Sequence, residues 1–322
     1  MANPNVGQTT AQAWQAYVGD KPADTIFNEY SQLARLEENK SFKGITGGRS
    51  VIGTVEYKVN TSVAAISDTE ELSTTRIDVF DEFEYSWRQY AGTFVMSTVE
   101  EAQNRGSNAK FDLASGKADN LLKSMRRKIN TDLFTAQAGV AMLGLPDLVA
   151  TDPTTGTVGG INRATYTWWR NQQTSGAQTT SAYDNLRSSM RTIHVACSTG
   201  MGTNEPEYYL GSSTDVNGYE GLLVANERLI DKRDKGQTNA GIDHDALMFK
   251  KAKVVWDKAA SSGTMFALNH SNPMLAYQEG KWFKAHDGVR PANQLVEITA
   301  VETQVCFFSP NPRHLGVISS IT

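Results

Sequence analysis

The feature that most constrains this chain is a change of hydrophobic period to two along residues 55–60 and 77–88. Apolar and polar side chains alternate in both segments, which is the pattern of a β-strand with one buried and one exposed face. The segment between them, TSVAAISDTEELST, is small and acidic and lacks the Asn-Gly type of turn that closes a two-residue hairpin. The sequence therefore predicts a long β-hairpin with an open tip.

This hairpin needs a cover, because an isolated two-stranded ribbon is only marginally stable in water. One of its faces is apolar and the other is acidic. It is expected either to lie on its own domain or to reach across to another copy of the chain, and the residues alone favour neither. The acidic residues expected to contact a neighbouring copy are Asp68, Glu70, Glu71, Asp81, Glu82 and Glu84.

A long amphipathic helix is predicted over residues 110–136, where apolar side chains recur three, four or seven positions apart. At 1.5 Å per residue such a helix spans roughly 40 Å. It carries a basic cluster formed by Lys123, Arg126, Arg127 and Lys128. Three interpretations of this cluster stay open: a solvated face, a partner for the acidic hairpin, or a weak contact with DNA phosphates, which require positive charge but no base-reading geometry.

The rest of the chain mixes shorter elements. Residues 1–45 are expected to form an extended arm with short helices, and a further helix is predicted over residues 181–193. Short strands are predicted at residues 207–210, 252–257, 264–269, 275–277 and 301–306. Because the regular strand-helix alternation of a doubly wound sheet is missing, the fold class is predicted to be α+β.

Composition restricts the class of protein. The chain has 322 residues, of which 39 % are hydrophobic and 20 % are charged, so it is expected to fold around a substantial core. A net charge of -4 excludes a protein whose main affinity for nucleic acid comes from global positive charge. No basic N-terminal segment precedes an apolar block, and no apolar stretch approaches the length of a membrane span. Neither export nor a membrane partner is expected.

The only two cysteines, Cys197 and Cys306, lie in apolar runs that resemble strands. Buried free thiols are expected rather than a disulfide, which indicates a reducing cytoplasm.

The common catalytic signatures are absent. Residues 200–205 begin like a dinucleotide-binding loop but lack its third glycine, and neither a Gly-x-Ser-x-Gly elbow nor a His-Glu-x-x-His pair occurs. Only His244, between Asp243 and Asp245, has close acidic neighbours, and this pattern favours a polar loop over a metal site. No catalytic residue, metal ligand or cofactor is therefore expected, and the chain is interpreted as not being an enzyme.

Residues 159–163, Gly-Gly-Ile-Asn-Arg, are followed at residues 167–171 by Thr-Trp-Trp-Arg-Asn. This segment resembles the "GGI-D-R … WWRN" stretch of the tailed-phage major capsid proteins, whose fold is shared with encapsulin shells and the floor of herpesvirus capsids. Gly47-Gly48 resembles the entry into the extended loop of that family, and residues 83–90 resemble its returning strand.

Residues 117–134 resemble the spine helix of the same family, which ends in an L-N-x-x-L-F style. The chain departs from this ending at Ile129, a conservative change. The resemblance covers nearly the whole chain. It implies an N-terminal arm, an extended loop, a peripheral domain and an axial domain, which map to residues 1–45, 46–98, 99–180 with 290–322, and 181–289.

The resemblance implies a structural major capsid protein that self-assembles into pentamers and hexamers of an icosahedral shell around phage double-stranded DNA. Its expected partners are other copies of itself, a portal, and packaged DNA through weak non-specific contact. A separate scaffolding protein is also expected, because no long scaffolding segment precedes the arm, and a decoration protein is compatible with the reading. The expected location is the virion, after assembly in the cytoplasm of a bacterial host.

Two alternatives stay open: an encapsulin-like compartment that encloses cargo enzymes, and a soluble enzyme whose site is assembled from scattered residues. Some members of the family cross-link themselves through a loop lysine and an asparagine of a neighbour. Here Lys58 is the only lysine of the hairpin and lies near the start of its first strand, so no cross-link is expected.

Overall fold

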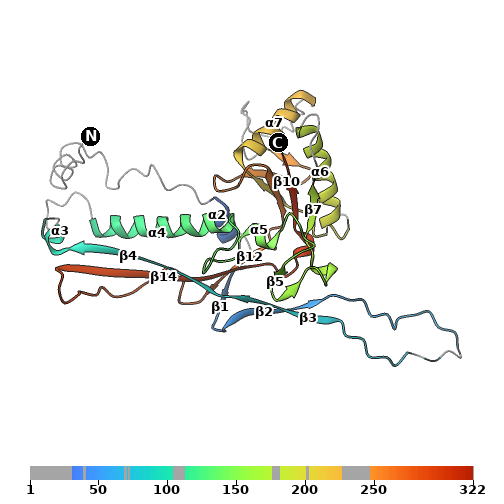
Figure 1. Cartoon of the computed structure of the whole chain (residues 1–322), viewed down its shortest axis with the longest axis horizontal. Helices are drawn as coiled ribbons and strands as arrows, with labels where there is room; N and C mark the ends of the chain where they lie inside the picture. The colour runs from blue at the N-terminus through green and yellow to red at the C-terminus, as the bar shows by residue number, and fades with distance from the viewer. Residues whose placement is uncertain are drawn as a thin grey trace, which may run out of the picture.

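The computed structural model of this chain describes residues 31–38, 41–68, 71, 73–103, 113–175, 182–200, 203–226 and 247–321. Within these residues a compact lobe of sheet and helices, a long ribbon beneath a helix, and a protruding hairpin meet near the centre of an elongated molecule (Figure 1). Helices and strands occur in mixed order along the chain, which confirms the predicted α+β class.

The first sheet is built around β14 (Val296–Phe308), the longest strand described. Its order is β1-β12-β14-β13, formed by Phe42–Ile45, Met274–Gln278, β14 and Lys284–Ala285. Strand β4 (Arg88–Ser97) also pairs with β14, antiparallel, along its whole length from Arg88 opposite Val305 to Ser97 opposite Val296. The two strands form a ribbon that helix α3 (Thr98–Gln103) follows.

Helix α4 (Leu113–Leu133) runs along this ribbon (Figure 1). Its apolar stripe is buried at Met125, Ile129 and Leu133, which confirms the predicted amphipathic helix. Close approach to β4 depends on Gly92, because a Cβ atom there would lie 2.6 Å from Cδ1 of Leu121. The helix ends at Leu133, earlier than the predicted residue 136, and residues 110–112 lie outside the described part of the chain.

The second sheet forms the lobe and has the order β7-β15-β11-β8-β10-β9. These strands are Gln172–Ser175, Gly316–Ser319, Thr264–Leu268, Tyr208–Gly211, Ala252–Trp256 and Met248–Phe249. Helices α6 (Ala182–Cys197) and α7 (Ser213–Asn226) lie beside this sheet (Figure 1). Each of the five strands predicted after residue 200 overlaps an observed strand, and the helix predicted over residues 181–193 is α6.

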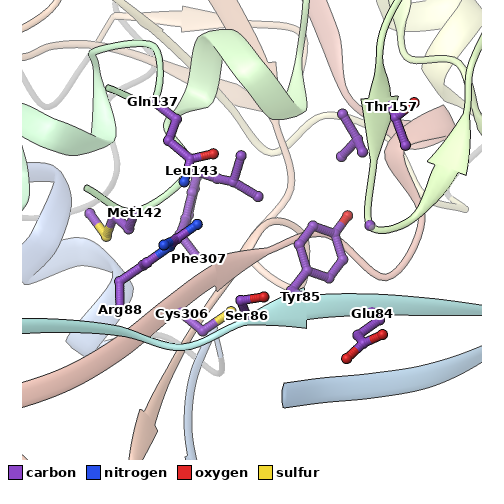
Figure 2. A pocket seen from close by; sticks show the side chains of 12 residues that line it. Glu84, Tyr85, Ser86, Arg88, Gln137, Met142, Leu143, Thr157, Cys306 and Phe307 are labelled. Carbon is purple, nitrogen blue, oxygen red and sulfur yellow. The ribbon is translucent and has the colours of Figure 1, made fainter. Parts of the chain in front are cut away.

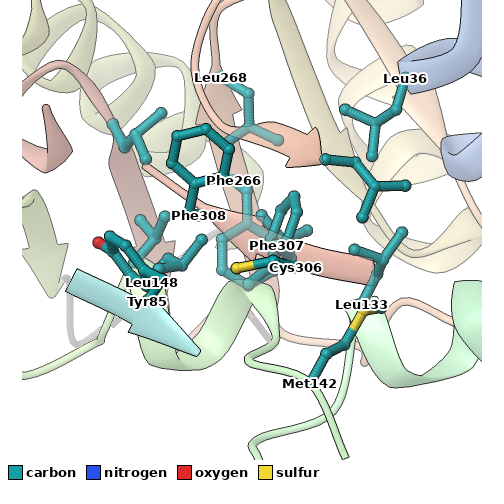
Figure 3. Close-up of a cluster of buried hydrophobic side chains, with 14 of the residues drawn as sticks. Leu36, Tyr85, Leu133, Met142, Leu148, Phe266, Leu268, Cys306, Phe307 and Phe308 are labelled. Atoms are coloured by element: carbon teal, nitrogen blue, oxygen red, sulfur yellow. The ribbon is translucent and has the colours of Figure 1, made fainter. Parts of the chain in front are cut away.

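One buried cluster joins the two sheets (Figure 3). Phe307 and Phe308 at the end of β14 meet Phe266 and Leu268 of β11, while Leu133 reaches the cluster from α4. Burial of apolar surface is the dominant stabilising contribution to a fold. The ribbon and the lobe therefore share a core at the point where the hairpin begins.

Five short elements and helix α2 complete the described chain. Helix α2 and strand β1 both lie within the predicted arm, and the five other elements connect α4 with β7 or β14 with β15. Their bounds are α2 Ser31–Glu38, α5 Leu145–Leu148, β5 Thr157–Val158, β6 Ile161–Asn162, η1 Thr167–Trp169 and η3 Pro312–His314.

Two expectations about local structure were wrong. The run that ends at Cys197 is the last turn of α6, not a strand, because β-branched residues that line a buried helix resemble a buried strand. Both cysteines are nevertheless buried and free, as predicted, and burial raises the pKa of each thiol to about 12. The hairpin strands also have other bounds than predicted: β2 is Ser50–Glu56, which begins and ends earlier than residues 55–60, and β3 is Phe80–Ser86, which is shorter than residues 77–88.

Beyond these strands the hairpin continues as a paired but irregular tip. The amide of Tyr57 donates to the carbonyl of Val79 at 3.0 Å, and the described residues from 58 to 78 contain no strand. Val59 and Val63 are 82 % and 83 % exposed. Regular pairing stops where the ribbon extends past the described residues that cover its root, as expected for an isolated two-stranded structure.

Candidate functional site

The root of the hairpin has one face buried by its own chain. Strand β2 pairs with β3 so that Val51 lies opposite Tyr85 and Gly53 lies opposite Phe83. Val51, Phe83 and Tyr85 are buried. The ring of Phe83 lies across Gly53, where a Cβ atom would stand 2.2 Å from Cζ of Phe83. The sequence left open whether the hairpin is covered by its own chain or by another copy. At the root, the cover comes from its own chain.

The seat of the root is the segment 158–169, which contains the Gly-Gly turn and both tryptophans. Gly159 and Gly160 have φ values of +59° and +79°, a region that favours glycine. The carbonyl of Gly159 accepts a hydrogen bond from the amide of Glu84 at 3.0 Å. A Cβ atom on Gly159 would lie 2.9 Å from the ring of Tyr85. The glycine turn therefore brings the backbone of the seat directly against β3.

The tryptophans of the seat stack on the hairpin. Trp169 stacks on Phe83 with 5.9 Å between ring centroids, and Trp168 stacks on Tyr57 at 5.1 Å. Trp169 is fully buried, and its Nε1 donates to the carbonyl of Val158 at 2.8 Å. Aromatic stacking and a satisfied indole N–H together fix the seat beneath the root.

Arg163 holds the seat to α5. It is buried, and its Nη2 donates to the carbonyls of Asp147, at 2.9 Å, and Leu148. Burial lowers the pKa of this guanidinium, since the charged form is the one that desolvation penalises. Tyr85 approaches from the hairpin side, where its hydroxyl donates to the carbonyl of Ser309 at 3.1 Å and burial raises its pKa. Gly159, Arg163 and the two tryptophans of the motif therefore all hold the hairpin root or its seat in place.

The acidic candidates divide into two groups. Glu82 and Glu84 lie on the exposed face of β3, next to Ile52 and Phe80, which are 62 % and 59 % exposed. Asp81 is half-buried on the other side. Asp68 and Glu71 are exposed in the tip, and Glu70 lies outside the described residues.

The basic candidates on α4 differ in exposure and in the partners described for them. Nη1 of Arg126 lies 3.5 Å from Oε2 of Glu37, and its guanidinium lies over the ring of Phe283 at 5.4 Å. Lys128 pairs with Asp132 at 2.8 Å. Lys123 is half-buried and Arg127 is exposed. Arg126 and Lys128 therefore each lie beside a carboxylate that is not part of the hairpin.

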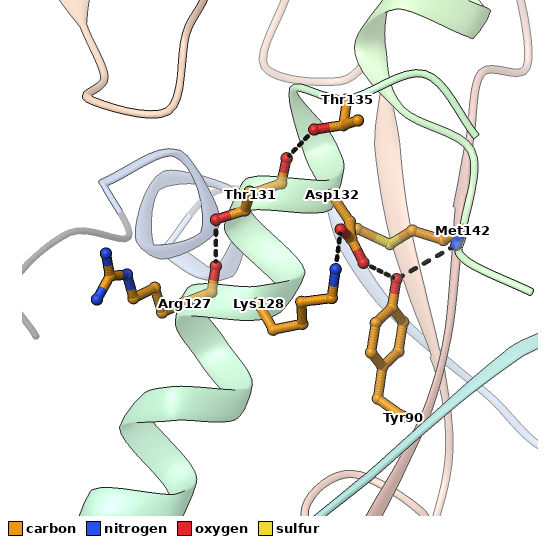
Figure 4. A network of polar contacts seen from close by, with 7 residues as sticks. All are labelled: Tyr90, Arg127, Lys128, Thr131, Asp132, Thr135 and Met142. Carbon is orange, nitrogen blue, oxygen red and sulfur yellow. Dashed lines mark hydrogen bonds and ion pairs between the residues drawn. The ribbon is translucent and has the colours of Figure 1, made fainter. Parts of the chain in front are cut away.

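Asp132 belongs to a network that joins α4 to the ribbon (Figure 4). Its carboxylate accepts a hydrogen bond from the hydroxyl of Tyr90 on β4 at 2.8 Å, while that hydroxyl accepts one from the amide of Met142 at 3.2 Å. Burial raises the pKa of the Tyr90 hydroxyl, which keeps it a donor. The basic cluster thus contributes, through Lys128, to the attachment of the helix to the ribbon.

A second buried network, which sequence reasoning missed, fastens α2. The amide of Gln32 donates to Asp257 at 3.0 Å and the amide of Leu33 donates to Oδ1 of Asn130 at 3.0 Å, so distant side chains cap the first turn of the helix. Asn130 also donates to Asp257 at 3.2 Å. An asparagine within a helix is a poor helix former, and Asn130 beside the buried Ile129 was the available signal.

A cavity of about 200 Å³ opens where β3 gives way to β4 (Figure 2). Its lining is mixed, and includes Tyr85, Arg88, Gln137, Thr157 and Phe307. In Figure 2 the side chains of Arg88 and Gln137 extend toward one another from opposite walls. This cavity was not predicted, because its walls come from five separate stretches of chain.

Among the described residues, no group of three or more His, Cys, Asp or Glu side chains is placed to hold a metal ion. The predicted polar loop at His244, with Asp243 and Asp245, lies outside them. In the same described part, every helix is too short or too polar to cross a membrane.

A hairpin seated on a glycine turn, a long helix on a two-stranded ribbon, and a separate sheet lobe together define the tailed-phage capsid fold, and comparison with solved structures gives the same assignment. The chain superposes on the capsid asymmetric unit of cyanophage A-1(L) with a TM-score of 0.66 at 16 % identity, covering 95 % of this chain and 97 % of that one. The capsid of Myoviridae phage XM1 gives 0.58 at 10 % identity, over 99 % and 100 % of the two chains.

The same fold occurs in the holo-SrpI encapsulin complex from Synechococcus elongatus PCC 7942, with a TM-score of 0.60 at 10 % identity over 100 % of this chain and 96 % of that one. No family model and no curated protein matches the sequence. The chain therefore has the fold of the tailed-phage major capsid proteins, as the resemblance implied.

Proposed function

We propose that this chain is a structural, non-catalytic major capsid protein, whose copies assemble into pentamers and hexamers of an icosahedral shell around phage double-stranded DNA. The observation that carries the proposal is the match to the cyanophage capsid chain, which covers 95 % of this chain and 97 % of that one. Closed symmetry multiplies modest contacts between copies, so individually weak interfaces can still form a stable assembly.

The hairpin is proposed to be the part that reaches a neighbouring copy. Its root is held by Trp169 and Gly159 of its own chain, while its tip extends from the molecule (Figure 1). A rigid root with an exposed tip can deliver contacts at a fixed distance from the body of the subunit. Glu82 and Glu84, on the exposed face of β3, and Asp68 and Glu71 in the tip are the proposed contact residues.

The proposed domain map is arm 1–45, extended loop 46–98, peripheral domain 99–180 with 290–322, and axial domain 181–289. Helix α4 falls in the peripheral part and α6 and α7 in the axial part. The pairing of β4 with β14 supports a continuous connection between the loop and the peripheral domain.

The proposed partners besides other copies are a separate scaffolding protein, a portal, packaged DNA, and a decoration protein as an optional addition. The proposed location is the virion, with assembly in the cytoplasm of the bacterial host. Contact with DNA is proposed to be weak and non-specific, because Arg126 and Lys128 already have acidic partners within the chain.

An encapsulin-like compartment is the second candidate, and the match to the encapsulin complex is the observation that favours it. The content of native particles separates the two functions. Double-stranded DNA inside them supports the capsid, and a packaged enzyme supports the compartment. Size-exclusion chromatography with electron microscopy tests both, since each predicts capsomers or closed shells, whereas a soluble enzyme predicts a monomer or small oligomer.

A further inference from the structure

Arg88 lines the cavity at the hairpin root without an acidic partner. It is the first residue of β4, lies opposite Val305 and is half-buried. Within the part of the chain that the structure describes, no carboxylate lies within ion-pair distance of its guanidinium. Two titratable neighbours, Cys306 and Tyr90, are held neutral because burial raises the pKa of each. A partly buried cation therefore faces a cavity whose one acidic lining residue among those described, Glu84, lies beyond ion-pair distance.

The cavity suits a carboxylate. A guanidinium presents a planar fork of N–H donors that matches the two oxygens of a carboxylate, and such paired bonds are stronger than neutral ones. The walls add polar groups at Ser86, Gln137 and Thr157. The amide nitrogen of Gln137 already donates to the carbonyl of Ala141 at 2.9 Å, which fixes this wall. A volume of about 200 Å³ leaves room for the end of a side chain.

Among the described residues, the one acidic residue that lines the cavity is Glu84, and its carboxylate does not pair with Arg88. Glu84 is exposed, and in Figure 2 its carboxylate lies beyond Tyr85, on the other side of the strand from Arg88. The tip of the same hairpin extends away from the root (Figure 1). The tip is nevertheless the richest local source of carboxylates, because Asp68, Glu70 and Glu71 fall within four residues and no basic residue lies between 59 and 75.

We propose that the cavity around Arg88 receives a tip carboxylate, from Asp68 or Glu71, of a second copy of this chain. The inference rests on the proposed shell function and names the surface that accepts the hairpin. Each copy then gives one tip and accepts another, which is a head-to-tail contact that closes into a ring when the rotation between copies allows it. Charge complementarity also restricts how the two copies can dock.

The test is an exchange of charges in the full-length chain, under conditions in which the unaltered chain forms shells. Arg88→Glu and the double variant Asp68→Lys/Glu71→Lys are made separately and together, and shell yield is measured by sucrose-gradient sedimentation and negative-stain electron microscopy. Arg191→Glu, on the exposed side of α6, is the matched control for a change of the same charge. Thermal unfolding of unassembled material shows that each variant folds.

Arg88→Glu alone and the tip variant Asp68→Lys/Glu71→Lys alone are each expected to reduce shell yield about tenfold, because each places like charges together at every repeated contact. The combined variant is expected to recover most of the yield, and Arg191→Glu is expected to assemble normally. If Arg88→Glu assembles normally while the tip reversal does not, the hairpin reaches a different surface and the Arg88 proposal is wrong. If both assemble normally, the hairpin makes no essential acidic contact, and if the unaltered chain stays monomeric, the shell function itself fails.

Discussion

Phe83 on the hairpin and Trp169 in the seat stack with 5.9 Å between their ring centroids, although they are far apart in sequence. Both side chains are buried. This contact joins the segment that needed a cover to the motif that carried the family resemblance. The seat therefore holds the hairpin at a fixed angle. Disruption of the seat should release the hairpin without unfolding the lobe.

Gly159→Ala tests the seat. The new Cβ atom would lie 2.9 Å from the Tyr85 ring, at a residue whose φ is +59°. We expect a loss of about 1–3 kcal/mol of stability from the strained backbone together with the contact. Gly160→Ala is the matched control, because it has a φ of +79° but no atom within 4 Å of its added Cβ. Limited proteolysis of the hairpin should increase for Gly159→Ala more than for Gly160→Ala, and equal effects would show that backbone strain alone matters.

Gly92→Val tests the attachment of α4 to the ribbon. A Cβ atom at Gly92 would lie 2.6 Å from Cδ1 of Leu121, so the helix must shift or the side chain must move. Overpacking of this kind costs typically about 1–3 kcal/mol. Denaturant unfolding should show this loss, whereas Gly221→Ala in α7, where the added atom meets nothing within 4 Å, should leave stability unchanged or raise it. A neutral Gly92→Val would mean that the packing of α4 on β4 is loose.

Asn130→Ala tests the buried hydrogen-bond network that fastens α2. The substitution leaves the buried amide of Leu33 without its acceptor and removes a donor from Asp257. An unsatisfied buried polar group costs about 1–3 kcal/mol. Proteolysis within α2 should accelerate. A double-mutant cycle with Asp257→Asn should reveal coupling between the two sites, and additive effects would argue against a shared network.

His194 is predicted to make stability depend on pH. Burial, followed by the nearby charge of Lys250, lowers its pKa below the usual 6.5. The unfolded chain therefore binds a proton more readily than the folded chain, so stability falls as the pH drops from about 6.5 toward the folded pKa. Thermal unfolding of His194→Gln across this range should show a weaker dependence on pH than the unaltered chain. An unchanged pH profile would remove His194 from the account.

Much of the fold followed from local patterns. The hydrophobic period of two at residues 55–60 and 77–88 predicted the hairpin, and apolar side chains three, four or seven positions apart predicted α4. Both patterns arise because one face of each element is buried. The pattern did not show that the second hairpin strand divides at Trp87 into β3 and β4, because the two halves have the same alternation and differ only in their partners, β2 and β14.

Less of the candidate site could be predicted from the sequence, because a local pattern does not show which distant segments contact one another. The acidic residues of the hairpin and the Gly-Gly and tryptophan motif were all recognised, but their separation in the chain hid the contact between Phe83 and Trp169. The basic cluster on α4 was also recognised, but the pattern did not show that Arg126 lies near Glu37 and that Lys128 pairs with Asp132. Contacts between distant segments depend on tertiary packing, which no local pattern encodes.

The most direct test of the central claim is an electron-microscopy reconstruction of particles assembled from the full-length chain. The account predicts closed icosahedral shells of pentamers and hexamers, in which every hairpin is seated at its root on its own Trp169 and extends at its tip onto a neighbouring copy. A chain that remains a monomer or small oligomer, or shells in which the hairpin tip contacts only its own subunit, would contradict it.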